Sequence, residues 1–301
     1  MKKSISICIC TFRRAHIADT LRSVFQLKID PQWDVKIIVA DNDEIDSARQ
    51  LVESVAKETT LPTQYVHAPA RNISIARNAC LDAATTPLIA FIDDDEIVTR
   101  DWLKALLEKL ENSNADVVLG TVKAIYAPEC PDWLRKGDFL STYPVWVGNE
   151  IITGYAGNAL IKRISPALQK IKFREDLGKS GGEDTVYFSQ VHKAGGVIVF
   201  SPEAIVTEMV TPERAKFSWL LKRRFRAGQT HALLLIENGT NNVNERIKNI
   251  LKALAKLSFC FVAALVSFTR PIKMRLWLLR GALHAGVIAR LLGKQEIIQY
   301  G

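Results

Sequence analysis

Short apolar runs alternate with amphipathic stretches along the first 120 residues of the chain. Continuous apolar runs at 5–10, 35–40, 87–92 and 117–119, with a shorter one at 64–66, have the length and composition of buried strands. The stretches at 15–27, 45–58, 74–84 and 100–112 have helical patterns, and Ser74 is a candidate cap for the third. Buried strands separated by helices predict an α/β fold with a mostly parallel sheet covered on both faces.

The pattern changes after residue 122. The segment 123–150 holds three prolines and several aromatic residues, which predicts a long, shaped loop. A helix is expected over 184–194 and two short strands over 197–209. From Arg214 onward the pattern is almost wholly helical, interrupted by a polar linker at 238–242. We therefore expect a domain over 1–230 and a helical C-terminal extension over 231–301.

Polar residues stand where the predicted strands end, at Thr11, Asp41 and Asp93. Ligands of open α/β sheets bind at the carboxyl ends of the strands, so these residues mark a candidate binding edge. Asp93, Asp94, Asp95 and Glu96 follow one strand directly. Such a cluster is either a solvated turn or a site for a hard divalent cation, because adjacent carboxylates repel unless a positive charge lies among them.

A second acidic site follows two glycines, in the sequence Gly181-Gly182-Glu183-Asp184. Glycine permits a tight turn and a close approach of ligand to backbone. Asp184 at the start of a helix is either an N-cap or a general base, a carboxylate that takes a proton from an attacking hydroxyl.

These motifs, in this order, resemble glycosyltransferase family 2, a family of inverting, nucleotide-sugar-dependent enzymes with the GT-A fold. The resemblance covers about residues 5–228 and is strongest to bacterial exopolysaccharide glucosyltransferases of the succinoglycan type. It rests on six pieces of sequence: Thr11-Phe12-Arg13, Asp41, Asn72-x-Ser74-x-Ala76-Arg77-Asn78, Phe91-Ile92-Asp93-Asp94-Asp95, Asn158 and Gly182-Glu183-Asp184. It implies a Rossmann-like nucleotide-sugar-binding sheet with flanking helices.

The resemblance also implies a role for each matching residue. The residues expected at the nucleotide sugar are Thr11, Arg13, Asp41 at the base, Arg77 at the base or diphosphate, Asp93, Asp94, and Asn158 near the donor sugar. Asp95 would bind a Mn²⁺ or Mg²⁺ ion at the diphosphate. Asp184 would be the general base, and Glu183 would position the acceptor.

The chain departs from the family pattern at two places. Many relatives have a histidine near residues 204–209, where this chain has Thr207 and Glu208, so Glu208 is a candidate oxygen ligand of the metal. Processive relatives have a Gln-x-x-Arg-Trp motif, which the stretch 222–229 lacks. We therefore expect a transferase that adds a single sugar. In that stretch we expect either a solvated helix face or a contact with the diphosphate from Arg223, Arg224 or Arg226.

Net charge separates the two ends of the chain. Of 301 residues, 40 are Lys or Arg and 32 are Asp or Glu, for a formal charge of +8. Residues 1–212 sum to −4 (24 basic, 28 acidic) and residues 213–301 to +12 (16 basic, 4 acidic). The basic residues of the tail alternate with aliphatic runs and not with stacking aromatics, which favours an anionic membrane surface over nucleic acid.

The run Leu257–Thr269 is 13 residues long without a charge, too short to span a bilayer. The tail is therefore expected either to lie in the membrane interface or to pack as a helix pair on protein. The expected location is cytoplasmic, peripheral on the cytosolic face of the inner membrane. Trp133, Tyr143 and Trp146 are either sugar-stacking or core residues.

The family resemblance, together with the basic tail, implies transfer of a hexose from a UDP-sugar to a hydroxyl of a lipid-linked glycan, in synthesis of an exopolysaccharide or cell-surface polysaccharide. One alternative is a Mg²⁺-dependent phosphohydrolase with Asp93 as nucleophile and Asp95 as acid and base. Another is a non-catalytic polyanion-binding module that uses the basic tail.

Overall fold

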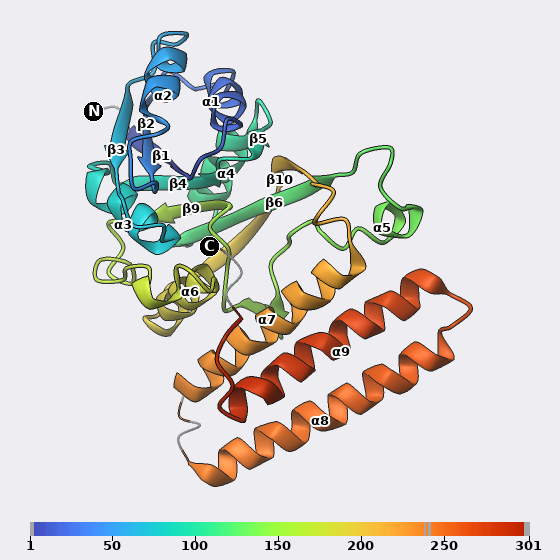
Figure 1. Ribbon diagram of the computed structural model, residues 1–301. Helices are drawn as coiled ribbons and strands as arrows, with labels where there is room; N and C mark the ends of the chain where they lie inside the picture. The colour runs from blue at the N-terminus through green and yellow to red at the C-terminus, as the bar shows by residue number, and fades with distance from the viewer. Residues whose placement is uncertain (1–2, 238, 240–241, 298–301) are drawn as a thin grey trace. The chain divides into compact units, whose positions relative to one another are not determined.

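A computed structural model describes residues 3–237, 239 and 242–297, which form two compact units (Figure 1). The sheet unit comprises residues 3–125 and 141–209, and the helical unit comprises 126–140 and 210–297. A boundary at residue 230 would cut through helix α7 (Phe217–Glu237), so the helical unit begins earlier than the predicted extension.

The sheet unit is built on one eight-stranded, mostly parallel sheet. Strands β1 to β4 are parallel to one another, β9 runs antiparallel between β4 and β6, and β5 pairs antiparallel with β10 at the edge. In spatial order the strands are β3 (Thr63–His67), β2 (Trp33–Asp41), β1 (Lys3–Thr11), β4 (Leu88–Asp93), β9 (Asn158–Lys162), β6 (Val117–Ile125), β10 (Ile198–Met209) and β5 (Glu96–Val98).

Apolar cores lie on both faces of this sheet, as the continuous apolar runs predict. Successive side chains of a strand point to opposite faces. Ile5, Ile7 and Ile9 of β1 belong to one buried cluster, and Cys8 and Cys10 belong to the other. The helices of this unit are α1 (Ile17–Phe25), α2 (Arg49–Ala56), α3 (Ile73–Ala83), α4 (Trp102–Glu111), α6 (Glu183–Lys193) and the 3-10 turn η1 (Glu175–Leu177).

The segment 123–150, expected to be a loop, contains regular structure. Strand β6 continues to Ile125, and a short helix α5 (Asp132–Gly137) and a hairpin of β7 (Trp146–Val147) and β8 (Glu150–Ile151) follow. Where two short strands are expected over 197–209, the structure has the single strand β10. Its pairing with β6 shifts between Ser201 and Ile205, where Pro202 lacks a backbone donor, so the apparent break is a bulge.

The helical unit consists of α5, α7, α8 (Val243–Val266) and α9 (Pro271–Leu291). Helix α9 packs against both α7 and α8. Ala232, Ala253, Val287 and Leu291 form a small buried core among the three long helices. Part of the predicted linker at 238–242 lies outside the described residues.

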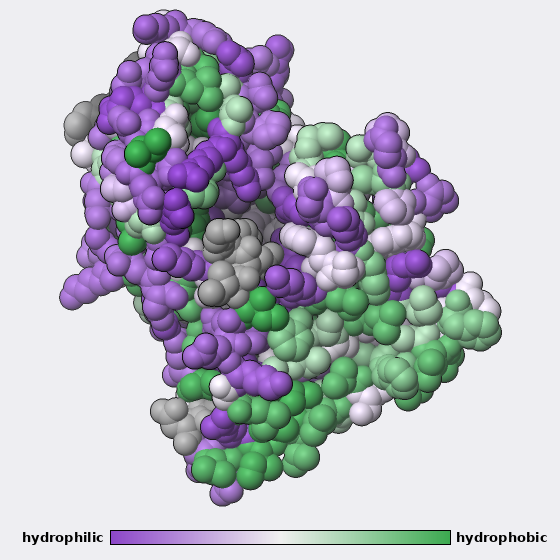
Figure 2. Space-filling model, viewed as in Figure 1, coloured by the Kyte–Doolittle hydropathy of each residue, from purple (hydrophilic) through white to green (hydrophobic). Residues whose placement is uncertain are grey.

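Helix α8 is longer than the apolar run that the sequence pattern isolates. Its 24 residues are long and apolar enough, by length and composition alone, to cross a membrane, and only 17% of its most apolar stretch is buried. The length argument against a membrane span therefore applies to Leu257–Thr269 and not to α8, which contains most of that run. Figure 2 shows hydrophobic residues gathered over the C-terminal helices on the viewed face.

Candidate active site

The acidic loop, residues 93–95 at the end of β4, is held by side chains from the end of β1 and from the segment before α1. Thr11 donates its hydroxyl proton to Asp94 Oδ2 at 2.8 Å, and Arg14 Nη1 donates to Asp94 Oδ1 at 2.9 Å and to Asp95 Oδ2 at 2.6 Å. Burial raises the pKa of Asp94 to about 6, although the charge of Arg14 acts in the opposite direction. Arg14 therefore supplies positive charge to the acidic loop.

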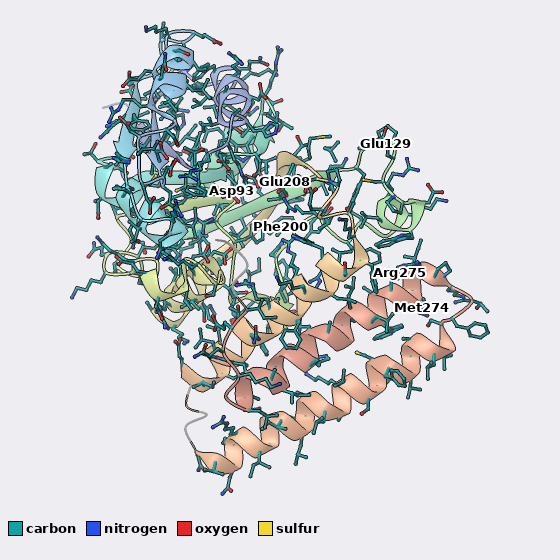
Figure 3. The ribbon with its side chains drawn as sticks, in the orientation of Figure 1. Asp93, Glu129, Phe200, Glu208, Met274 and Arg275 are labelled. Carbon is teal, nitrogen blue, oxygen red and sulfur yellow. The ribbon has the colours of Figure 1, made fainter. Side chains whose placement is uncertain are left out.

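Two further carboxylates, from β5 and β10, lie beside this loop. Glu96 is buried and accepts a hydrogen bond from the backbone N of Asp93 at 2.8 Å, and burial followed by the charge of Asp93 raises its pKa. Glu208 pairs with Glu96 across the β5–β10 ladder, so the structure brings Glu208 to the acidic loop, as Figure 3 shows for Asp93 and Glu208. A Cβ at Gly157 would lie 2.8 Å from Glu96 Oε1 and 3.0 Å from Asp93 Oδ2, so only glycine leaves these carboxylates in place.

Arg77 joins the acidic loop to the second acidic site. Its Nη1 forms a short ion pair with Glu183, and its Nη2 lies 3.4 Å from Asp93 Oδ1. Both Arg77 and Glu183 are buried. Burial lowers the pKa of Arg77, but the charges of Glu183, Asp93 and Asp184 outweigh it and raise that pKa. One guanidinium thus connects carboxylates that are 90 residues apart in the sequence.

The glycine pair before α6 presents Glu183 and Asp184 at the start of that helix. Gly181 and Gly182 have φ values of +84° and +85°, a left-handed conformation that side chains with a Cβ disfavour. Asp184 accepts a hydrogen bond from the backbone N of Thr185 at 2.6 Å and is partly exposed. Glu183 Oε2 has no hydrogen-bond partner among the described residues, although it is buried.

Asp41 lies at the end of β2, but both of its carboxylate oxygens are already engaged. Oδ1 accepts from the backbone N of Asp43, and Oδ2 accepts from the backbone N of Ala48 and from the Tyr65 hydroxyl at 2.6 Å. The carboxylate is fully buried and shapes the loop that follows. A contact with a base, predicted for Asp41, would have to compete with these bonds.

Asp43 in that loop pairs with Arg13, whose φ of +53° is unusual for a residue with a Cβ. The hydrogen bond from Arg13 lowers the pKa of Asp43 to about 2. This pairing places a charged guanidinium beside the end of β1. The structure therefore brings Arg13 near the predicted nucleotide edge and gives it an acidic partner.

Asn158 has a packing role in this structure, which does not support the predicted contact with a donor sugar. Its side chain is fully buried. Oδ1 accepts from Trp102 Nε1 at 2.8 Å, and Nδ2 donates to the carbonyls of Thr121 and Ala204. The polar group is satisfied inside the sheet and faces no solvent.

Ser74 is not the cap of α3. Asn72 is the N-cap, and its side chain accepts from the backbone N atoms of Ser74 and Ile75. Among the aromatic candidates, Tyr143 and Trp146 are exposed, whereas Trp133 packs edge-on against Phe217 within the helical unit.

The donor set of the acidic loop suits a hard cation, because it consists of carboxylate oxygens only. Asp93 and Asp95 are 43% and 24% exposed at their side chains and can be reached from solvent. Across the residues that the structure describes, no three His, Cys, Asp or Glu side chains are arranged to hold a metal ion by themselves. An ion bound here would need further oxygen ligands from a substrate, as Mg²⁺ sites commonly do.

The family model for glycosyl transferase family 2 matches residues 6–165, more than half of the chain. The chain belongs to glycosyltransferase family 2. It is 50% identical over 297 residues to the succinoglycan biosynthesis protein ExoM of Rhizobium meliloti strain 1021, covering 99% of this chain and 96% of that protein. It is 24% identical over 271 residues to the glucosyl-dolichyl phosphate glucuronosyltransferase of Haloferax volcanii, covering 82% of this chain and 83% of that protein.

Solved structures confirm the predicted GT-A fold of this family 2 chain. The mannosyltransferase PcManGT from Pyrobaculum calidifontis, in complex with GDP-Man and Mn²⁺, superimposes with a TM-score of 0.65 at 17% identity, covering 98% of this chain and 89% of that one. TarS residues 1–349 from S. aureus superimpose with a TM-score of 0.54 at 19% identity, covering 100% and 97%. At these identities the likeness concerns the fold.

Two residues of this family 2 site have no place in the sequence analysis: Arg14 and Asp43. Arg14 adjoins the Thr11-Phe12-Arg13 motif, so proximity to a motif was the available signal. Asp43 gave no signal of its own, since its importance comes from a contact with Arg13 that is 30 residues away. The roles assigned to individual residues stay predictions.

Proposed function

We propose that this chain is an inverting, metal-dependent glycosyltransferase that moves a hexose from a UDP-sugar to a hydroxyl of a lipid-linked glycan. The observation that carries the proposal is the pair of contacts made by Arg77, which bring Asp93 of the acidic loop beside Glu183 and its neighbour Asp184. The proposed donor site and the proposed base would thereby lie near each other, as transfer between two bound substrates requires.

The likeness to known proteins supports the finer parts of the proposal. A relative at 50% identity over nearly the full length is named for succinoglycan biosynthesis, which supports a role in making a bacterial exopolysaccharide. The name of the archaeal relative includes a dolichyl phosphate, which supports a lipid-linked acceptor. The mannosyltransferase with the same fold was solved with Mn²⁺ and a nucleotide sugar, which supports a metal-dependent reaction.

In the proposed reaction Asp184 accepts the proton of the acceptor hydroxyl. The acceptor oxygen forms its bond to C1 of the donor sugar as the bond from C1 to the diphosphate breaks. A single displacement of this kind inverts the configuration at C1, and one carboxylate suffices because the nucleoside diphosphate leaves without a proton. Glu183, held by Arg77, positions the acceptor beside Asp184.

Asp93 and Asp95 are the residues that would hold Mn²⁺ or Mg²⁺, with Glu208 as a further oxygen donor. A bound divalent ion would neutralise the negative charge that develops on the departing diphosphate. Arg14 now compensates Asp94 and Asp95, so a cation bound by Asp95 would share that carboxylate with Arg14. Thr11 and Arg13 would lie along the nucleotide. The absence of the processive motif supports addition of a single sugar.

The test is a screen of UDP- and GDP-sugars for nucleoside diphosphate release, with a lipid-linked acceptor extract and with or without Mn²⁺. We expect release from a UDP-hexose that stops with EDTA, returns with Mn²⁺, and is lost in Asp95→Ala. Asp82→Asn is the matched control, since Asp82 is an exposed carboxylate paired with Lys172 in the same unit. Release that persists in EDTA, or that occurs only from GDP-sugars, would contradict the corresponding part of the proposal.

A further inference from the structure

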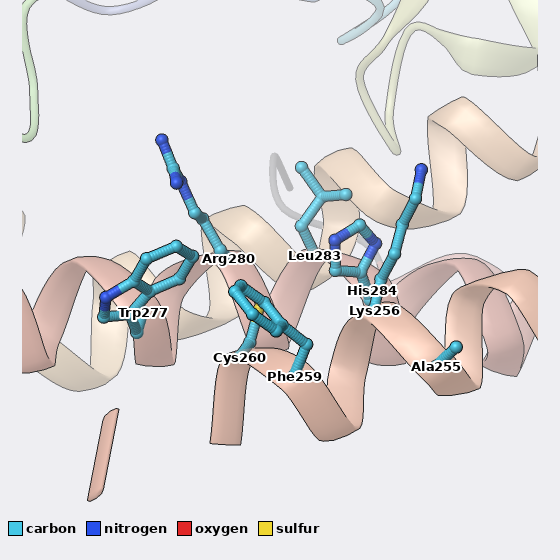
Figure 4. A pocket seen from close by; sticks show the side chains of 8 residues that line it. All are labelled: Ala255, Lys256, Phe259, Cys260, Trp277, Arg280, Leu283 and His284. Atoms are coloured by element: carbon cyan, nitrogen blue, oxygen red, sulfur yellow. The ribbon is translucent and has the colours of Figure 1, made fainter. Parts of the chain in front are cut away.

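An open groove of about 570 Å³ lies between α8 and α9 within the helical unit (Figure 4). Each of the two helices contributes both basic and aromatic side chains to it. Its lining includes Lys256, Phe259, Cys260, Trp277, Arg280 and His284.

The groove gathers positive charge. Figure 4 shows Lys256 of α8 and Arg280 and His284 of α9 pointing to the same side. Burial lowers the pKa of His284, and the nearby charges of Lys256 and His231 lower it further, as expected where cations lie together. Within the described ranges, no carboxylate forms an ion pair with Lys256 or Arg280.

The acidic residues near these helices have other partners. Glu245 pairs with Lys248 at 3.2 Å, and Glu296 lies 3.7 Å from Arg290. The positive charge of the groove therefore has no compensation from the described part of the helical unit. Clustered cations repel one another, so a bound anion would stabilise this arrangement.

Aromatic rings form the floor of one end of the groove. Phe259 and Trp277 meet edge to face with centroids 5.4 Å apart, and the guanidinium of Arg280 lies 4.9 Å from the Trp277 ring. Stacking on the ring fixes the plane of the guanidinium and leaves its N–H donors at the edge. A guanidinium held in this way suits the oxygens of a phosphate group.

An exposed apolar stripe runs along α8 beside the groove. Leu251, Leu254, Val262 and Leu265 recur at helical spacing and are 60%, 42%, 57% and 58% exposed. They lie on the face away from Ala253, Cys260 and Ala264, which are buried. A soluble anion such as a nucleotide would gain nothing from this stripe, whereas a lipid presents a phosphate and an acyl chain together.

We propose that this groove binds the phosphate group of an anionic membrane lipid, while the exposed stripe of α8 lies among its acyl chains. Lys256 and Arg280 contact the phosphate oxygens, and Trp277 lies at the level of the headgroup, where its amphipathic ring is favoured. The inference rests on the membrane partner of the proposed function and names the site of that contact. It does not depend on the transfer reaction.

The test is flotation of the full-length chain with vesicles of phosphatidylcholine, with and without 30% phosphatidylglycerol, at fixed salt. If the attraction to an anionic surface is diffuse, the partition coefficient should fall about fivefold for each basic residue that is removed near that surface. The groove variant is Lys256→Gln/Arg280→Gln. The matched control is Lys252→Gln/Lys273→Gln, which removes one exposed cation from α8 and one from α9 outside the groove lining.

We expect the control pair to lose about 25-fold in partition and the groove pair to lose at least tenfold more. Equal losses of partition in the groove pair and the control pair would overturn the site, because charge alone, without a binding geometry, would produce equal losses. Binding should be kept in Lys256→Arg, whereas Arg280→Lys should lose part of it, since lysine lacks the planar guanidinium that stacks on Trp277.

Two further readouts separate the lipid from other occupants. Brominated acyl chains should quench the tryptophan fluorescence of the wild type, and Trp277→Phe should remove most of that quenching. Two outcomes would overturn the lipid assignment. One is protection of the groove by inorganic phosphate without vesicles. The other is a dimer in sedimentation of the wild type that the groove substitutions dissociate. Nucleoside diphosphate release by the groove variant without vesicles should equal that of the wild type, so failure of this proposal and failure of the proposed function are distinguishable.

Discussion

In the sheet unit, four carboxylates of the two acidic sites are matched by basic side chains from the same unit, whereas in the helical unit the groove cations have no acidic partner among the described residues. Arg14 pairs with Asp94 and Asp95, and Arg77 pairs with Asp93 and Glu183. Arg280 lies over the Trp277 ring, and across the described ranges neither Arg280 nor Lys256 has an acidic partner. The difference indicates that the first cluster is stable by itself and that the second is suited to a partner from outside the chain.

The largest effect expected from this comparison is at Asp184. Asp184→Asn keeps the size and shape of the side chain but removes the proton acceptor, so kcat should fall by about 10²–10⁴-fold. KM for the donor should change little, since the change lies on the acceptor side. Steady-state kinetics of UDP release measure both constants. Normal turnover in this variant would remove Asp184 from its assigned role.

The buried pair of Arg77 and Glu183 should dominate the stability of the sheet unit. Arg77→Met leaves the buried Glu183 without its partner, which should cost about 3–5 kcal/mol of the free energy of unfolding. Chemical denaturation measures this loss. Arg22→Met is the control: it breaks an exposed two-bond pair with Glu58 and should have a much smaller effect, because solvent screens that pair. Comparable losses would show that the burial of Arg77 does not matter.

Asp94 should make stability depend on pH in a defined direction. Its pKa is raised from 3.8 to about 6, so the folded state holds the proton more tightly than the unfolded state does. The free energy of unfolding should therefore fall as pH rises from about 4 to 6, by at most about 3 kcal/mol from this group. Asp94→Asn should remove that part of the slope. An unchanged slope, measured by urea denaturation across this range without metal, would contradict the assignment.

The smallest effect is expected where α7 and α9 cross. A Cβ at Gly286 would lie 1.9 Å from the carbonyl oxygen of Phe225, so Gly286→Ala forces the helices apart and should cost about 1–3 kcal/mol. At Gly281 the nearest contacts would be 3.5 and 3.6 Å, so Gly281→Ala should be neutral or stabilising. Hydrogen exchange of α9 measures both, and equal protection in the two variants would argue against a close crossing.

Much of the fold follows from local sequence. The buried strands β1, β2 and β4 and their polar ends were predicted because continuous apolar runs before Asp41 and Asp93 have few other interpretations. Strands β5 and β9 were not predicted. Each is short, and β9 pairs antiparallel with strands that are distant in sequence, so no local pattern marks it. Pro202 made one bulged strand resemble two.

The candidate site divides in the same way. Residue types that carry chemistry, such as Asp93, Glu183 and Asp184, can be selected from the sequence, because they follow apolar strands or glycines. Which of them contact one another depends on side-chain direction and burial. Asn158 stands in a family motif, yet the fold directs its amide into hydrogen bonds with Trp102 and two carbonyls.

The sequence by itself determined the family, the parallel strands and the separation of a −4 body from a +12 tail. These are properties of residue type and local order. Only the tertiary structure decided that Arg77 joins two acidic sites and that Lys256 and Arg280 share a groove. Contacts of this kind form between residues far apart in the chain, and their strength depends on burial, which no local pattern fixes.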